Sequence, residues 1–404
     1  MRYNLFSTTS SSTAPVWSRL SHIRLWLIPV IFAATLCATL GDLKAQPYKF
    51  TRIADTASGY QWPVTPAITN SGSVVFKAKM SDGNVGIFRS SGDGVETLVN
   101  GSGVFDDIGE FATNDSGHVV FTGRNASAYG VYKFVNGIVS LVADESGGMS
   151  LFRGVTINDS GEVAFVAQVA NGFGIFTGPD VTTDRVARDN GITLHPWYSF
   201  PEMDDDGSIV FRARRSQPSR TFGVFRASGD SVDLIAPMPG EANEDIAIGT
   251  DGNVLTLSKD ELGVESILSH RSGVVQTIVD NSGEFLVLRS PQMNAKGQVV
   301  FQAQLDNHAR GIFMGPNPTT DKVILSGDSL FGGVVDYFQL GSGFNDAEQV
   351  AFSYVLTNGV SGIALATPVP EPCAAAHSAF LFMLIAWRRC VARPNLRSCK
   401  LDGF

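Results

Sequence analysis

Seven copies of one short motif recur at nearly constant spacing along the middle of the chain. Each copy joins a polar turn, usually closed by glycine, to a variable residue, two apolar residues and, in six copies, phenylalanine. The copies are spaced by 45, 44, 46, 45, 45 and 51 residues and end at Phe76, Phe121, Phe165, Phe211, Thr256, Phe301 and Phe352. A fixed period of this length indicates a repeat architecture, because so short a unit cannot bury its apolar face alone.

Each repeat holds three further apolar elements. A glycine followed by an aliphatic and an aromatic residue comes next, as at residues 86–88, and an alternating stretch follows it, as at residues 96–99. A shorter element, such as residues 155–158, leads into the next polar turn. About four short strands in about 45 residues match one blade of a propeller. We therefore predict an all-β fold, a seven-bladed β-propeller over residues 46–366.

The polar turn of the motif has a clear local role. Asn and Asp side chains bond to backbone groups two residues on, and the glycine supplies the positive φ that a tight turn needs. Six copies keep this glycine, and Glu348 replaces it in the last copy. The phenylalanine four residues after the glycine is predicted to pack between adjacent sheets. The repeated positions are therefore interpreted as turn and core residues.

The two ends of the repeat array predict how the ring closes. The last copy stops after the element at residues 362–363, without the alternating strand that follows in earlier copies. Residues 50–55 precede the first copy and fit the missing position. An N-terminal strand that completes the last blade would remove the exposed sheet edges of an open array. An open β-solenoid with caps is the alternative.

The N-terminal segment has the parts of a secretory signal peptide. Arg19, His22 and Arg24 precede an apolar run over residues 25–40, and Ala45 stands at the end of the segment. The run is shorter than the roughly 20 apolar residues of a spanning helix. Residues 1–45 are therefore predicted to be a signal peptide that directs export. An uncleaved anchor is the alternative.

The C-terminal segment combines a proline-rich linker, an apolar helix and an arginine cluster. The linker, residues 367–372, contains Pro370, Glu371 and Pro372. Residues 373–390 are mostly apolar and include Arg388 and Arg389, and a polar tail follows at residues 391–404. Arginines after an apolar helix hold its end on the cytoplasmic side.

This order of parts resembles the PEP-CTERM sorting signal of Gram-negative bacteria. The resemblance implies an exosortase-type sorting enzyme as a partner and attachment to the inner membrane through the C-terminal helix before processing. The mature protein would then reside in the cell envelope, on the outer surface, or be released. A plain single-pass anchor is the alternative.

The motif itself resembles the tandem NxxGxxAF repeats of exported bacterial proteins, over nearly all of residues 50–366. That family often carries PEP-CTERM tails and has no assigned activity. The resemblance therefore implies an exported repeat protein and no particular reaction.

Composition excludes several classes of function. A net charge of −9 argues against nucleic acid, which needs a basic surface. The four cysteines all lie outside residues 46–367, so the repeat domain has no disulfide and no thiolate metal site. Asp204, Asp205 and Asp206 are clustered but lack the alternating spacing of a calcium loop. No metal, cofactor or catalytic residue is predicted.

The predicted topology brings one set of loops to a common end of the ring. These are the loops that connect each outer strand to the next inner strand, together with the hairpins between second and third strands. They carry Asp106, Asp107 and Arg220 and the candidate ligand-binding residues Trp62, His195, Trp197, Tyr198, Arg214 and Arg215. Aromatic rings beside charges are typical of sugar or peptide recognition. In the alternative interpretation, Trp197 and Tyr198 only cover a hydrophobic loop cluster.

The sequence therefore favours an exported module of the cell envelope or extracellular matrix that binds or scaffolds without catalysis. An extracellular polysaccharide or a surface protein is the expected partner. A propeller enzyme acting on a polysaccharide or a lactone, and a purely structural surface protein, are the alternatives. An enzyme would need carboxylates or histidines that converge on the axis from several blades.

Overall fold

The computed structural model describes residues 48–92, 94–102, 104–126, 128–186, 192–193, 200–215, 221–229, 231–238, 246–249 and 252–369. The predicted signal peptide, the Pro-Glu-Pro motif and the predicted C-terminal helix lie outside the described residues. Within the described part of the chain, no helix is long and apolar enough to cross a membrane.

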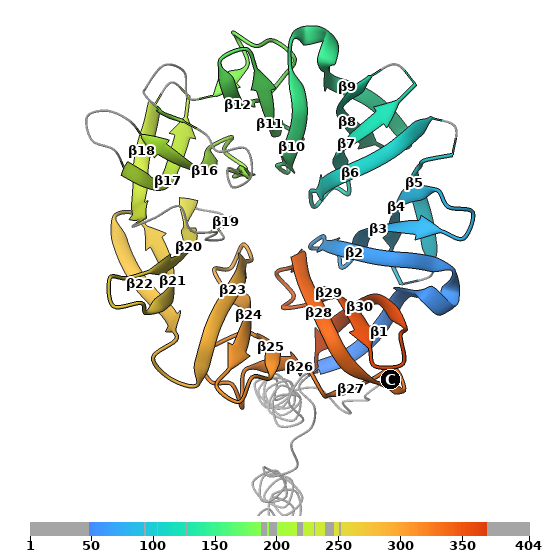
Figure 1. Ribbon diagram of the computed structural model, residues 1–404, viewed down its shortest axis with the longest axis vertical. Helices are drawn as coiled ribbons and strands as arrows, with labels where there is room; N and C mark the ends of the chain where they lie inside the picture. The colour runs from blue at the N-terminus through green and yellow to red at the C-terminus, as the bar shows by residue number, and fades with distance from the viewer. Residues whose placement is uncertain are drawn as a thin grey trace, which may run out of the picture. The chain divides into compact units, whose positions relative to one another are not determined.

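Seven antiparallel sheets stand in chain order around a common axis (Figure 1). This confirms the predicted seven-bladed β-propeller. Blade 1 comprises β2 (Tyr60–Ile68), β3 (Val74–Met80), β4 (Val85–Ser90) and β5 (Val95–Asn100). Blade 2 comprises β6 (Phe105–Thr113), β7 (Val119–Asn125), β8 (Tyr129–Val135) and β9 (Ile138–Asp144). Blade 3 comprises β10 (Ser150–Ile157), β11 (Val163–Val169), β12 (Gly172–Phe176) and β13 (Arg185–Val186).

Blades 4 to 6 follow the same order, and in blade 4 two short strands pair with the inner side of β16. Blade 4 comprises β14 (Ile192–Thr193), β15 (Glu202–Met203), β16 (Ile209–Arg215), β17 (Thr221–Ser228) and β18 (Ser231–Met238). Blade 5 comprises β19 (Ile246–Ile248), β20 (Val254–Lys259), β21 (Glu265–Arg271) and β22 (Val274–Asp280). Blade 6 comprises β23 (Phe285–Met293), β24 (Val299–Leu305), β25 (Arg310–Phe313) and β26 (Lys322–Leu325).

Blade 7 is built from both ends of the repeat array. It contains β28 (Gly333–Phe344), β29 (Val350–Leu356), β30 (Ser361–Pro368), the N-terminal β1 (Tyr48–Asp55) and the short β27 (Ser329–Leu330). β1 pairs antiparallel with β30, from Tyr48 opposite Pro368 to Asp55 opposite Gly362. The predicted closure by an N-terminal strand is therefore confirmed. In the described part of the chain, the short 3-10 helices η2 (Thr56–Ser58) and η3 (Glu145–Gly147) follow β1 and β9.

The aromatic residues of the repeat form clusters inside the blades. The repeat phenylalanine pairs across the sheet with the aromatic residue of the next strand, as Phe76 with Phe88 and Phe301 with Phe313. A third ring comes from the inner strand: Tyr60 lies 5.7 Å from Phe76, and Phe285 lies 5.6 Å from Phe301. Burial of such rings is a large part of the apolar area removed from water.

The innermost strands differ from the short fourth element expected from the sequence. β10 begins at Ser150, well before the apolar residues 155–157 that indicated it, and it is the first strand of the following blade. Register shifts occur twice along β2, β6, β10, β23 and β28. Each β-bulge inserts a residue and breaks the two-residue alternation, so these strands carry no simple pattern in the sequence.

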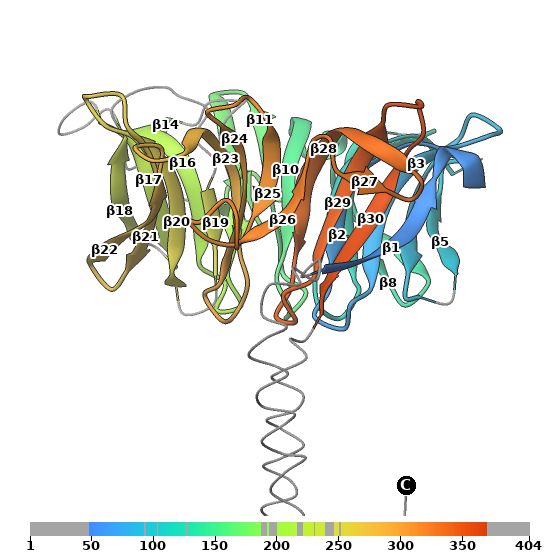
Figure 2. The same cartoon turned by 90° about the horizontal axis from the view of Figure 1, so that it is seen from below.

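The ring has two ends, seen in side view in Figure 2. We call one end the turn face, because it carries the polar repeat turns that join first and second strands. We call the other end the loop face. It carries the hairpins between second and third strands and the connections from each outer strand to the next inner strand.

Candidate functional site

Trp62 is an exposed aromatic residue of the loop face. It lies at a bulge near the start of β2 with φ of 48°, and its side chain is 71% exposed. The Lys79 ammonium lies 5.7 Å from the centre of its ring. A positive φ is uncommon for a bulky residue, so the bulge holds this ring outward at some cost in backbone energy.

The other predicted binding residues are only partly described. Arg214 lies in blade 4, where its guanidinium is 5.8 Å from the ring centre of Phe222. Arg215 pairs through its backbone with Ile192. His195, Trp197, Tyr198 and Arg220 lie outside the described residues. Trp62 and Arg214 belong to blades 1 and 4, so a single site that contains the whole predicted set stays a prediction.

A cationic recess opens between blades 6 and 7. We call it the blade 6–7 recess. It has a volume of about 380 Å³ and is lined by Arg289, Gln302, Ala303, Gln304, Arg310, Tyr337 and Phe338. Phe338 is buried and packs toward blade 6, whereas Arg289 and Arg310 are exposed. The recess therefore has an apolar residue at its base and a charged, accessible rim.

Strand register explains why the polar residues of this recess share one face of blade 6. Arg289 on β23 lies opposite Gln302 on β24, and Gln304 lies opposite Arg310 on β25. Because side chains alternate along a strand, residues 302 and 304 point to the same side. The Gln302 amide donates to the Phe338 carbonyl at 3.3 Å, which places this side toward β28 of blade 7.

The two arginines of the recess lack acidic partners. Among the described residues, no carboxylate forms an ion pair with Arg289 or Arg310. The two glutamine amides carry no charge. The recess therefore carries an uncompensated positive charge on a chain whose net charge is −9.

In blades 2 and 5, the cation at the position equivalent to Gln304 and Arg310 has a partner on the adjacent strand. In blade 2, Arg124 is opposite Tyr129, with its guanidinium 5.4 Å from the ring centre. In blade 5, Lys259 forms a 3.5 Å ion pair with the opposite Glu265. In each case the cation has a partner within its own sheet. Blade 6 instead places an arginine opposite a glutamine.

A second recess lies on the axis at the turn face. It has a volume of about 220 Å³, and the repeat turns line it with the side chains of Asn70, Asp115, Asp159, Asp205, Asn294 and their neighbours. Two partial rings of hydrogen bonds pass between the blades here. In the first ring, an asparagine at the first position of a turn donates its side-chain amide to the backbone carbonyl of the equivalent residue in the next blade: Asn114 to Asn158 (2.8 Å), Asn158 to Asp204 (3.3 Å), Asn294 to Asn345 (3.1 Å) and Asn345 to Thr69 (3.0 Å).

The second ring uses the second residue of the turn. Its backbone N–H donates to the side chain of the equivalent residue in a neighbouring blade: Asn70 to Asp115 (2.6 Å), Asp115 to Asp159 (2.8 Å), Asp159 to Asp205 (3.0 Å) and Asp346 to Asn70 (2.9 Å). The sequence predicted only a local turn role for these residues. The structure shows that they also join adjacent blades.

The axial recess is acidic. Burial, with the nearby charges of Asp115 and Asp205, raises the pKa of Asp159. Burial, with the charges of Asp206 and Asp205, also raises the pKa of Asp204. Within the described residues, no group of three or more His, Cys, Asp or Glu side chains is arranged to hold a metal ion. The acidic side chains here serve mainly as acceptors for the neighbouring blade.

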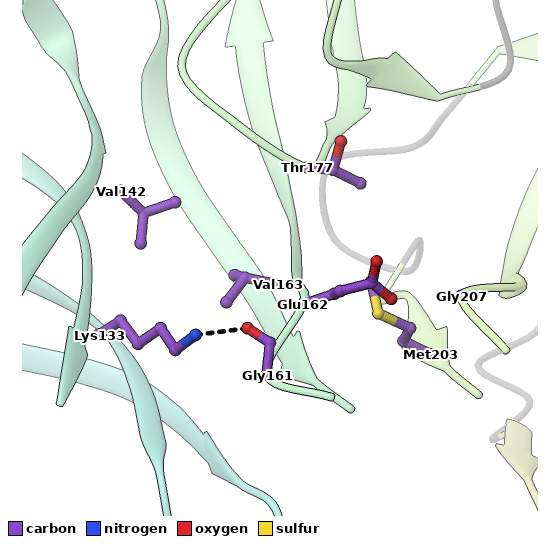
Figure 3. Close-up of a pocket in the computed structure, with 8 residues that line it drawn as sticks. All are labelled: Lys133, Val142, Gly161, Glu162, Val163, Thr177, Met203 and Gly207. Atoms are coloured by element: carbon purple, nitrogen blue, oxygen red, sulfur yellow. Dashed lines mark hydrogen bonds between the residues drawn. The ribbon is translucent and has the colours of Figure 1, made fainter. Parts of the chain in front are cut away.

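A third recess, of about 440 Å³, lies beside the turns of blades 3 and 4 (Figure 3). Lys133 reaches from β8 and donates to the Gly161 carbonyl at 2.5 Å. The Glu162 carboxylate accepts from the Asn158 amide at 2.8 Å. The two charged residues of this recess are therefore already bonded within the turn region. In contrast, the arginines of the blade 6–7 recess form no ion pair among the described residues.

Sequence reasoning did not identify Arg289, Arg310 or Tyr337. Gln302 and Gln304 flank Ala303 in the alternating strand after Phe301, so their common face could have been read from the sequence. Arg289 precedes a bulge, where Ser290 has a φ of 47°. Because the bulge shifts the register, the pairing of Arg289 with Gln302 on β24 could not be predicted from sequence spacing.

Comparison with known proteins supports the fold. The chain matches no protein-family model and no curated protein. Among solved structures, an oligogalacturonate lyase in complex with manganese has a TM-score of 0.50 at 10% identity, covering 80% of this chain and 97% of that one. TolB from Acinetobacter baumannii has a TM-score of 0.38 at 13% identity, covering 78% of this chain and 64% of that one, less than two thirds of its length. YCF48 from Cyanidioschyzon merolae has a TM-score of 0.40 at 10% identity, covering 79% and 98%. At such low identity these likenesses concern the fold alone. The chain is a seven-bladed β-propeller, a fold shared by binding scaffolds and enzymes.

Proposed function

We propose that this chain is an exported binding module of the cell envelope or extracellular matrix, which recognises its partner on the loop face and does not catalyse a reaction. The observation that carries the proposal is the blade 6–7 recess. Its arginines have no acidic partner among the described residues, whereas the cations at the same register in blades 2 and 5 are paired.

The exposed aromatic residues of the same face support a role in recognition. Trp62 and Tyr337 are 71% and 44% exposed on inner strands that begin at the loop face. Rings held outward offer stacking surfaces to a sugar or a peptide. The polar residues of the axial recess, in contrast, form the hydrogen bonds that join the blades, which favours binding over catalysis on the axis.

The two ends of the chain support the proposed address. An apolar segment preceded by basic residues fits export, and the Pro-Glu-Pro segment with its arginine cluster fits processing by an exosortase-type enzyme. Fractionation of the native host tests this part. Protein in the envelope or medium is expected, and full-length protein confined to the cytoplasm would contradict it.

Binding is tested with the purified protein on an array of extracellular polysaccharides. The expected result is retention of at least one polysaccharide, without its cleavage over prolonged incubation. Cleavage would favour an enzyme, and an array with no retained polymer from a correctly folded sample would favour a purely structural surface protein. Circular dichroism supplies the control for folding.

A further inference from the structure

We propose that the blade 6–7 recess binds an acidic polysaccharide, with Arg289 and Arg310 contacting carboxylates of the sugar chain. This inference rests on the proposed function, because it names the ligand class for the same loop-face module. It depends on two features of the recess: a pair of guanidiniums without an ion pair among the described residues, and two amides that lie between them.

The arrangement of donors fits an extended ligand. Arg289, Gln302, Gln304 and Arg310 form a diagonal row across three adjacent strands. From strand spacings of roughly 4.8 Å and residue rises of roughly 3.4 Å, the Cβ atoms of the two arginines lie about 12 Å apart. A row of this length can contact successive units of a chain.

Each kind of group in the row suits one part of an acidic sugar. A guanidinium binds a carboxylate through two parallel hydrogen bonds, which a lysine cannot reproduce. The amides of Gln302 and Gln304 each donate once within the protein, to the carbonyls of Phe338 and His308, both at 3.3 Å. This fixes their orientation and leaves an amide oxygen and a second N–H for sugar hydroxyls.

The amides favour a sugar over an acidic peptide. Gln302 and Gln304 lie between the two arginines, where they can bond to the hydroxyls of a sugar chain. A polyglutamate chain could satisfy the guanidiniums but offers no hydroxyls. The surrounding protein has a net charge of −9, so long-range attraction of any polyanion is weak and the contacts must be local.

The test is calorimetric titration of the full chain with a short oligomer of mannuronic acid. A mannose oligomer of the same length and linkage differs only in lacking the carboxylates, and a polyglutamate peptide represents acidic peptides. The variants are Arg289→Gln and Arg310→Gln. Arg124→Gln is the matched control, since it removes the same charge at the equivalent register of blade 2, from an arginine already stacked on Tyr129.

We expect the mannuronic acid oligomer to bind, the mannose oligomer to bind at least tenfold more weakly, and each arginine variant to lose about tenfold in affinity. Arg124→Gln should match the wild type. Affinity should also fall as salt is raised, since the rim is accessible to solvent.

Two outcomes would overturn the inference while the proposed function stands: sugar binding that is unchanged in both arginine variants, or polyglutamate binding as tightly as the sugar. Binding of the mannose oligomer alone would have the same meaning, because it shows glycan recognition without the carboxylates. If no oligomer binds and the polysaccharide array is also inert, the proposed function itself fails.

Discussion

Asn345→Asp tests whether the repeat turns join the blades or only shape themselves. Asn345 is 2% exposed and occupies the turn of blade 7, where the ring closes onto blade 1. Its Oδ1 accepts from the backbone N–H groups of Ala347 and Gln349, at 3.1 and 3.0 Å. Its Nδ2 donates to the Thr69 carbonyl at 3.0 Å and to the Gln349 side chain at 2.9 Å.

An aspartate at this position keeps the two acceptor bonds of the turn and loses both donor bonds. Each lost bond contributes about 1 kcal/mol, and a buried carboxylate facing the Thr69 carbonyl adds a comparable penalty. We therefore expect the free energy of unfolding to fall by about 2–4 kcal/mol at neutral pH. Urea denaturation followed by circular dichroism measures this as a lower midpoint at unchanged slope.

Asn358→Asp is the matched control. Asn358 is exposed in a hairpin of the same blade, and its Oδ1 accepts from the Val360 backbone N–H at 3.1 Å. The substitution adds the same charge and keeps the acceptor, so a change below about 0.5 kcal/mol is expected. Equal losses for the two variants would refute the reasoning, because the bond to blade 1 would then contribute nothing measurable.

Three further predictions concern titration and the exposed aromatic ring. Asp159→Asn should stabilise the protein increasingly as pH rises from acidic to neutral, because the raised pKa of Asp159 makes its ionisation unfavourable in the folded state. An amide is compatible with this position, since Asn70 accepts the equivalent hydrogen bond between blades 7 and 1. A pH profile of urea midpoints equal to that of the wild type would contradict this. Burial raises the pKa of Glu202 to about 7 from about 4.5, so the wild type should lose stability between those values, whereas thermal denaturation of Glu202→Gln should show no such loss. Trp62→Ala should change the free energy of unfolding by less than about 0.5 kcal/mol, because the ring is 71% exposed; a larger loss in urea titration would mean that the ring packs on the blade.

The blade count and the closure could be predicted because they depend on strictly periodic positions. The repeat phenylalanines are fully buried, and the turn glycines take positive φ, as at Gly72 with 84°. Glu348, which replaces the last of these glycines, adopts the same left-handed conformation with φ of 58°. The turn geometry is therefore imposed by the repeat even where the residue does not favour it.

The inner strands and the recess could not be predicted for a physical reason. Bulges at Trp62 and Leu151, with φ of 48° and 50°, break the alternation that identifies a strand. The pairing of Arg289 with Gln302 depends on the register that those bulges set. The sequence predicts the local acceptor role of the turn asparagines, as at Asn345, but its spacing gives no information on which neighbouring carbonyl the amide nitrogen reaches.

Hydrogen exchange measured with and without the mannuronic acid oligomer tests the central claim most directly, because it locates the ligand on the ring. The account predicts slower exchange in β23, β24 and β25 and in the first half of β28, with little change in the repeat turns. Protection that is confined to the turns around the axis, such as residues 114–117 and 158–161, would contradict it.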